Sequence, residues 1–273
     1  MQGLSYFVAT EDKINYLNLL LQVGFDTLDF GSFVSPQAIP QMADTAKVLK
    51  KLDLSNSPTK LLAIVANLRG VEEAIKHNAI TYLGYPFSVS ETFQTRNTNS
   101  DIKTSLSVVE KLLEKCRDSN KQAVIYLSMA FGNPYQEVWD EEIVINRTRD
   151  LVERGVSTIA LSDTVGAATP ESISKLYKII SLSFPETEIG VHLHSKPDGW
   201  RDKINAAYES GCRRFDTALK GYGGCPMATD TLTGNIATEN LLAYLTEKNE
   251  FTGLKMQAFQ EAMDFSARIF RQA

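Results

Sequence analysis

Two of the three histidines in this 273-residue chain, His192 and His194, lie one residue apart at the end of an apolar run. Alternate side chains of a β-strand face the same side, so both imidazoles are expected to point together while Leu193 points away. Two converging imidazoles supply half of a divalent-metal site. The alternative is a pair of surface histidines without a role in metal binding, and the motif alone does not decide between a metal site and such a pair.

A glycine-rich segment, residues 221–226, follows the histidine pair and carries Cys225. Glycines lack a Cβ atom, so such a backbone can approach a ligand closely. The other two cysteines, Cys116 and Cys212, follow helical patterns and are expected to be structural. Three cysteines without a close-spaced pair fit a reducing cytosol better than a disulfide scaffold.

The composition restricts the class of protein. With 43% hydrophobic residues the chain can bury a substantial core, and we expect one α/β domain over residues 1–273. A net charge of −5 argues against a nucleic-acid partner, and no basic run or long apolar stretch indicates a membrane partner. The N-terminus has no signal-peptide or transit-peptide pattern, so we expect a cytoplasmic protein.

Strand-like runs alternate with amphipathic helical patterns along the whole chain. The expected strands are residues 27–30, 60–66, 80–87, 122–130, 158–163, 188–194 and 213–218. Thr10 and Thr169 are expected to be helix N-caps, with Pro170 in the first helical position. Repeated strand–helix units predict a parallel sheet wrapped by helices, the arrangement of a (β/α)8 TIM barrel. Since that barrel needs eight strands, we expect this chain to lack the first strand and to be N-terminally truncated.

Polar residues collect where these expected strands end. In a TIM barrel the chemistry is built at that end of the strands. The residues concerned are Asp29, Asn67, Ser88, Ser90, Glu91, Ser128, Asp163, His192, His194 and Asn235. Any one of them can be explained as a helix cap, but the whole set at one end is harder to explain in that way.

This set predicts a metal-dependent enzyme. His192, His194 and Asn235 offer nitrogen and oxygen ligands to a divalent ion, which would polarise a carbonyl or an alkoxide. A metal, a base and an acid on a loop suit aldol or Claisen-type cleavage of a carbon–carbon bond, or the reverse condensation.

Three further residues are candidates for moving protons in that reaction. Asp29 and Asp163 are candidate general bases or orienting groups, and Cys225 on its glycine loop is a candidate proton donor. A covalent nucleophile is the other reading of Cys225, ranked lower because no third histidine is placed to activate it.

Seven segments spread over nearly the whole chain match one enzyme family in order. They are residues 31–44, 67–70, 90–97, 162–166, 192–194, 221–226 and 234–239. On these segments the chain resembles the 3-hydroxy-3-methylglutaryl-CoA (HMG-CoA) lyases of the DRE-TIM metallolyase superfamily. The Ser-Phe-Val-Ser-Pro run at 32–36 and Gly-Gly-Cys-Pro at 223–226 are the most specific matches, whereas His-x-His is shared with isopropylmalate and homocitrate synthases.

The resemblance implies cleavage of HMG-CoA to acetyl-CoA and acetoacetate with Mg²⁺ or Mn²⁺, as in leucine degradation, by a homodimer. It implies that His192, His194 and Asn235 bind the metal and that Cys225, Asp163, His192 and Asp29 are catalytic. The substrate-binding candidates are Asn67, Ser88 and Ser128.

The chain departs from the family pattern in two places. We expect it to lack the Arg-Asp pair that ends the family's first strand, and Ser195 stands where the family has an Asp after His-x-His. Two other functions remain open: a related acyl-CoA condensing enzyme, or an inactive barrel with a scaffold role.

Overall fold

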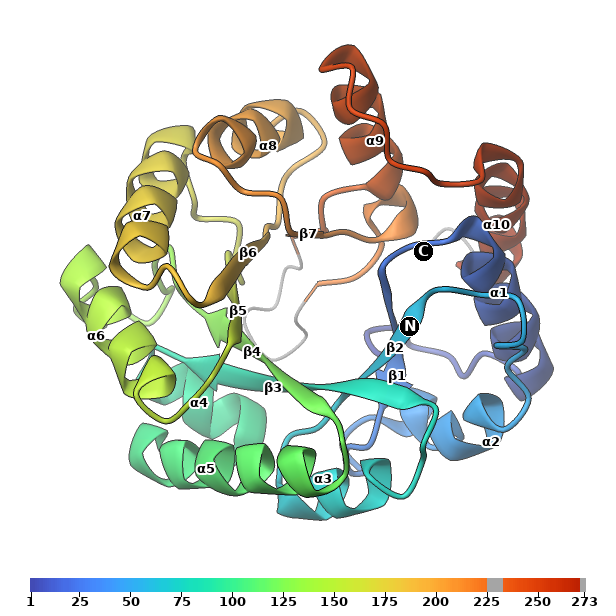
Figure 1. Cartoon of the computed structure of the whole chain (residues 1–273), viewed down its shortest axis with the longest axis horizontal. Coiled ribbons are helices and arrows are strands. Elements are labelled where there is room, and N and C mark those ends of the chain that lie inside the picture. The colour runs from blue at the N-terminus through green and yellow to red at the C-terminus, as the bar shows by residue number, and fades with distance from the viewer. Residues whose placement is uncertain (225–232, 271–273) are drawn as a thin grey trace.

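The structure is a computed structural model that describes residues 1–224 and 233–270. Its strands form one sheet in the order β1 to β7, and every neighbouring pair is parallel. The strands are Thr27–Ser32 (β1), Lys60–Ile64 (β2), Ile80–Ser88 (β3), Gln122–Ser128 (β4), Thr158–Ser162 (β5), Glu188–His192 (β6) and Phe215–Asp216 (β7). The sheet curls, with helices around its outer face (Figure 1), which confirms the predicted TIM-barrel architecture with seven strands.

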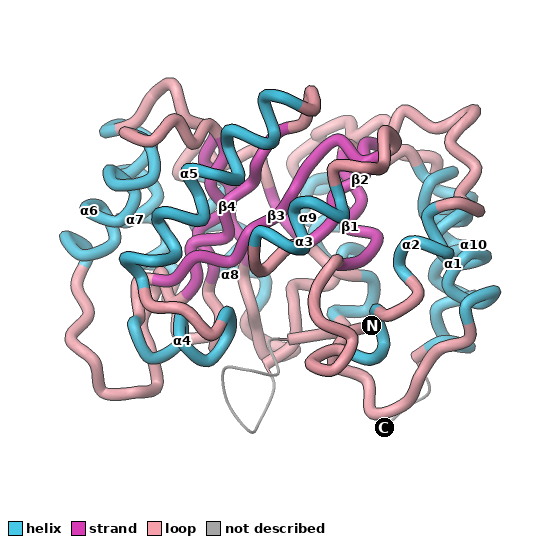
Figure 2. The backbone as a smooth tube through the Cα atoms, turned by 90° about the horizontal axis from the view of Figure 1, so that it is seen from below, coloured by secondary structure: helices cyan, strands magenta, loops and turns pink. Residues whose placement is uncertain are grey.

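Helices connect successive strands and cover the outside of the sheet. They are Thr10–Val23 (α1), Thr45–Leu49 (α2), Leu68–Ala74 (α3), Glu91–Thr98 (α4), Ile102–Asp118 (α5), Glu141–Val152 (α6), Pro170–Ser183 (α7), Trp200–Glu209 (α8), Thr238–Glu247 (α9) and Met256–Ile269 (α10). Short 3-10 turns cover Pro40–Met42 (η1) and Leu219–Gly221 (η2). The last helix, α10, packs beside α1, as Figures 1 and 2 both show.

The two faces of the sheet bury different residues. One large apolar cluster, which includes Leu83 and Ile125, fills the space between the sheet and the helices. The alternate residues Leu62, Tyr82 and Val124 form a separate small cluster on the inner face. Alternation along the strands therefore separates a large outer core from a small inner cluster on β2 to β4, and polar side chains gather at the ends of the strands.

The helix caps were predicted in part. Thr169 accepts a hydrogen bond from Ser172 N–H in a capping box, and Pro170 is the first helical residue, as expected. Thr10 is not an N-cap: Ala9 holds that position, and the Thr10 hydroxyl donates to Asp44 instead, at 2.7 Å. Within the described ranges, helix length and hydropathy leave no candidate for a membrane span.

Candidate active site

The histidine pair lies at the C-terminal end of β6. His192 is the last residue of that strand, and His194, two residues on, forms a bridge with Asn235 on the segment before α9. The two imidazole centroids are 5.4 Å apart. The alternation of an extended chain therefore turns both rings the same way and brings Asn235 beside them.

The amide of Asn235 is held by the glycine-rich turn. Its Nδ2 donates to the Tyr222 carbonyl at 3.0 Å, which leaves Oδ1 as the atom that can bind a cation. Gly223 has a φ of +113°, and a Cβ atom there would lie 2.7 Å from Asn235 Nδ2. Glycine is thus required at position 223 both for its backbone conformation and for the room that the amide needs.

The chemical state of these groups suits metal binding. Burial, together with the neighbouring His192, lowers the pKa of His194 to about 3, so the ring is neutral, the form that binds metals. The Nδ1 atoms of both histidines are buried without a hydrogen-bond partner in the described part of the chain. Among the described residues, no three His, Cys, Asp or Glu side chains are arranged to hold a metal ion by themselves, and the candidate donors are two imidazoles and the Asn235 amide oxygen.

Asp216, which we did not single out from the sequence, lies against the pair. It ends β7, the strand next to β6, and its Oδ2 is 3.6 Å from His192 Nδ1. Both atoms are buried and lack a hydrogen-bond partner among the described residues. The rule that selected Asp29, a carboxylate at the end of a strand, also fits Asp216.

Asp29 lies in the same region, on the opposite end strand of the sheet. It is the third residue of β1, so it is not at the end of the strand as we expected. The residue is exposed at the surface, and desolvation by the surrounding protein raises the pKa of its carboxyl to about 7. The charge of Asp216 adds to this rise in pKa and that of His192 opposes it, so the three groups share one electrostatic environment.

Tyr126 of β4 is a second residue that the sequence did not indicate. Its ring meets the His192 ring edge-on, with centroids 5.7 Å apart. Burial raises its pKa well above the usual value, and the carboxylates of Asp216 and Asp29 raise it further. The phenol therefore remains protonated and can donate a hydrogen bond into the interior of the barrel.

Asp163 is held in an ion pair. Its Oδ2 is 2.7 Å from Lys203 Nζ, and its Oδ1 accepts from the Ala168 N–H at 3.0 Å. Burial raises the pKa of this carboxylate, and Lys203 acts in the opposite direction. Its contacts are therefore those of a structural anchor; a role as a general base is not visible in them.

The three expected substrate-binding residues lie after β2, in β3 and in β4. Asn67 caps α3, where its Oδ1 accepts from the Gly70 N–H at 3.0 Å. The Ser88 hydroxyl accepts from Ser90 N–H at 3.0 Å and donates to the Ser128 carbonyl at 3.4 Å. The side chains of Asn67 and Ser88 are thus engaged in hydrogen bonds to the nearby backbone. The expected proton donor, Cys225, lies outside the described residues.

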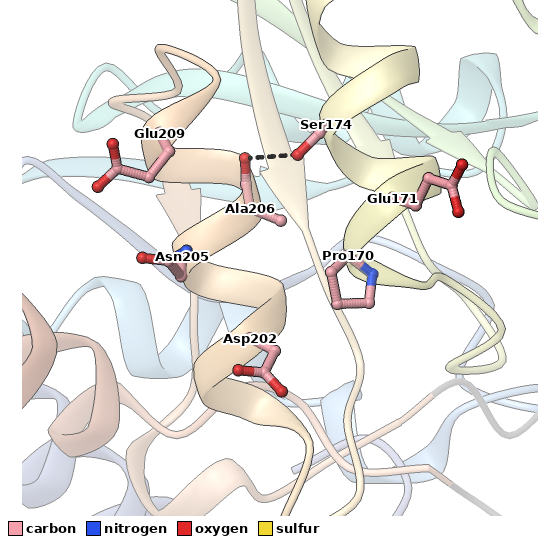
Figure 3. A pocket seen from close by; sticks show the side chains of 7 residues that line it. All are labelled: Pro170, Glu171, Ser174, Asp202, Asn205, Ala206 and Glu209. Carbon is pink, nitrogen blue, oxygen red and sulfur yellow. Dashed lines mark hydrogen bonds between the residues drawn. The ribbon is translucent and has the colours of Figure 1, made fainter.

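A separate hollow lies between α7 and α8 (Figure 3). Its lining includes three acidic residues, Glu171, Asp202 and Glu209, and the two helices are joined there by a hydrogen bond from the Ser174 hydroxyl to the Ala206 carbonyl. None of its lining residues is among the predicted site residues, so it is distinct from the histidine region.

Comparisons with known proteins agree on one family. The family model described as HMGL-like matches residues 1–265. A hydroxymethylglutaryl-CoA lyase of Bacillus subtilis is 32% identical over 96% of this chain and 87% of its own length. The human cytoplasmic 3-hydroxy-3-methylglutaryl-CoA lyase is 31% identical over 97% of this chain and 71% of its own length. An HMG-CoA lyase from Acinetobacter baumannii, solved with coenzyme A and 3-methylmalate, superposes with a TM-score of 0.90 at 28% identity, covering 98% of this chain and 87% of that one.

Proposed function

The chain belongs to the HMGL-like family, and we propose that it is a carbon–carbon lyase that cleaves HMG-CoA to acetyl-CoA and acetoacetate. The observation that carries the proposal is the grouping of His192, His194 and Asn235 at the end of β6, in a chain that matches HMG-CoA lyases over almost its full length. The related structure with coenzyme A supports an acyl-CoA substrate.

The HMGL-like family is generally metal-dependent, and the donor set of this chain fits a divalent ion. His192, His194 and the Asn235 oxygen would hold Mg²⁺ or Mn²⁺, both of which accept oxygen and imidazole ligands. When bound there, the ion supplies Lewis-acid polarisation of the substrate oxygens.

The reaction needs one proton removed and one proton added. Removal of the proton from the substrate's C3 hydroxyl lets a ketone form at C3 as the bond between C2 and C3 breaks, and C2 then takes up a proton to give acetyl-CoA. Asp29 is the base that we assign to the first step, because a pKa of about 7 lies near the operating pH. Cys225 is the donor that the family resemblance assigns to the second.

Two side chains beside His192 also support the proposed cleavage reaction. Tyr126 and Asp216 flank His192, so a phenol that can donate and a carboxylate that can accept a hydrogen bond lie beside the proposed metal site. Such fixed groups stabilise charge that develops in the reaction without having to reorganise.

The test is direct assay of the products. The full chain is incubated with HMG-CoA and Mg²⁺ or Mn²⁺, and acetoacetate and acetyl-CoA are measured over time, with chelator and no-enzyme controls. Equal amounts of the two products, formed only with the metal, are expected. Condensation of acetyl-CoA with a 2-oxo acid and no cleavage would favour the condensing enzyme, and neither reaction would favour a scaffold.

We further propose that the protein is cytoplasmic, forms a homodimer and acts in leucine degradation. One relative that matches this chain is named as a cytoplasmic enzyme. Fractionation of cells and light scattering of the purified chain test the location and the oligomeric state separately from the activity.

A further inference from the structure

Lys203, on α8, has a buried amine whose donors are all used. Its Nζ donates to Asp163 Oδ2 at 2.7 Å, to the His194 carbonyl at 2.7 Å and to the Gly166 carbonyl at 3.2 Å. The side chain is 9% exposed and the Asp163 side chain 1%. An ammonium group has three N–H donors, so this lysine is fully engaged with the segments that follow β5 and β6.

The anchor of this contact is itself fixed. Besides its bond to the lysine, Asp163 accepts from the Ala168 N–H, and its own N–H donates to the His192 carbonyl at 2.9 Å. The carboxylate therefore holds the Lys203 amine at a set position relative to the ends of β5 and β6.

His194 depends on this lysine in a way that His192 does not. His192 is still part of β6 and pairs with both neighbouring strands. His194 lies beyond the end of the strand, where its peptide carbonyl is bound by Lys203 and the next residue, Ser195, donates to the Gly234 carbonyl at 2.9 Å. Sheet pairing thus places the first imidazole, whereas the bridge to Asn235 and the bond from Lys203 together place the second.

We propose that Lys203 is a positioning residue for the metal site, because it fixes the His194 backbone from α8 while Asp163 holds its charge. This inference rests on the proposed metal-dependent function. It also gives Asp163 a role, because its carboxylate balances the buried positive charge of Lys203. The loss of groups that orient a metal ligand typically weakens metal binding by about 10- to 100-fold.

The test uses the full chain and Mn²⁺ alone as the probe. Lys203→Met keeps the length of the side chain and removes its donors. Mn²⁺ affinity is measured by electron paramagnetic resonance on the metal-free protein, and HMG-CoA cleavage is measured at saturating metal. We expect Mn²⁺ binding about 10- to 100-fold weaker per folded molecule, with cleavage recovering in part as metal is added. Lys203→Arg, which keeps the charge and the donors, should lie between the wild type and Lys203→Met.

Lys13→Met is the matched control. Lys13 forms an equally buried ion pair with Asp44, at 2.6 Å, and touches neither histidine. It should lower the unfolding midpoint and leave the Mn²⁺ affinity unchanged. Lys203→Met combined with Asp163→Asn covers the case in which an unpaired Asp163 prevents folding, because the double variant removes both charges of this pair and keeps an acceptor for the Ala168 N–H.

The outcomes separate the two proposals. If the wild type binds Mn²⁺ and cleaves HMG-CoA, and the Lys203 variants that fold bind Mn²⁺ as tightly as the wild type, the positioning role is overturned and the proposed function stands. A wild type that neither binds Mn²⁺ nor cleaves overturns both. Weaker binding in the Lys203 variants but not in Lys13→Met supports the role.

Discussion

Asp216 Oδ2 and His192 Nδ1 lie 3.6 Å apart, both buried and both without a hydrogen-bond partner in the described part of the chain. A carboxylate that accepts the second ring N–H of a metal-binding imidazole fixes the tautomer of the ring and raises its basicity toward the metal, and Asp216 lies at ion-pair distance from that nitrogen. The end of β7 therefore supports the end of β6, and two adjacent strands build one half of the site.

Asp216→Asn should weaken Mn²⁺ binding by about 10- to 100-fold, because the amide cannot supply the negative charge beside His192. A Mn²⁺ titration of the metal-free protein measures this. Asp26→Asn is the control, since the Asp26 side chain is 75% exposed and lies before β1. Equal Mn²⁺ affinity in the two variants would show that Asp216 does not act on His192.

Much of the fold was predictable because it depends on local patterns. All seven strands were expected within a few residues of where they lie, since each is a short apolar run between a helix and a polar end. The least accurate was the last: residues 213–218 were expected, and only Phe215–Asp216 form β7.

The site was less predictable, because it depends on contacts between distant segments. The pairing of Lys203 with Asp163 spans 40 residues and leaves no local pattern in the sequence. Asp216 is paired with His192 across β6 and β7, whereas Asp29 lies on β1 at the other end of the sheet, and only the curl of the barrel brings it near His192. His192, His194 and Asn235 were found because strand alternation and family motifs point to them directly.

Asp29→Asn should stabilise the metal-free protein at neutral and alkaline pH. The folded-state pKa of Asp29 is about 7, above its ordinary value of 3.8. The contribution of Asp29 to the stability of the wild type is therefore fully present below pH 3.8. It is lost as the pH rises from 3.8 to about 7, whereas the variant has no such loss. Urea unfolding in the presence of a chelator, at pH values from 4 to 8, measures the difference, and two curves that stay parallel would contradict the shift.

Gly223→Ala should disturb the metal site, because the new Cβ atom would lie 2.7 Å from Asn235 Nδ2. Gly211→Ala is a matched control: φ is +101° there, but a Cβ atom would meet nothing within 4 Å. Both variants should lose some stability to backbone strain, and only Gly223→Ala should also lose Mn²⁺ affinity. If both bind Mn²⁺ equally, the turn does not hold Asn235 for the metal.

Cys225→Ser tests the proton donor that the family resemblance assigns. A hydroxyl is a much weaker acid than a thiol, so turnover of HMG-CoA should fall by about 10²- to 10⁴-fold, the range for loss of acid–base catalysis. Folding and Mn²⁺ affinity should remain as in the parent. Cys116→Ser would not serve as a control, because that thiol is buried in the core. Turnover by Cys225→Ser within a few-fold of the parent would show that Cys225 is only a loop residue.

The central claim is that His192 and His194 hold a metal on which cleavage depends. The most direct measurement is acetoacetate release from HMG-CoA by the wild type, by His194→Ala and by His77→Ala, each after chelation and after Mn²⁺ is added back. His77 is the remaining histidine and stacks on Phe33, away from the pair. We predict that chelation stops the wild type and His77→Ala, that Mn²⁺ restores both, and that His194→Ala stays inactive at any Mn²⁺ concentration. Release that persists in the chelated wild type, or unchanged release by His194→Ala, would contradict the account.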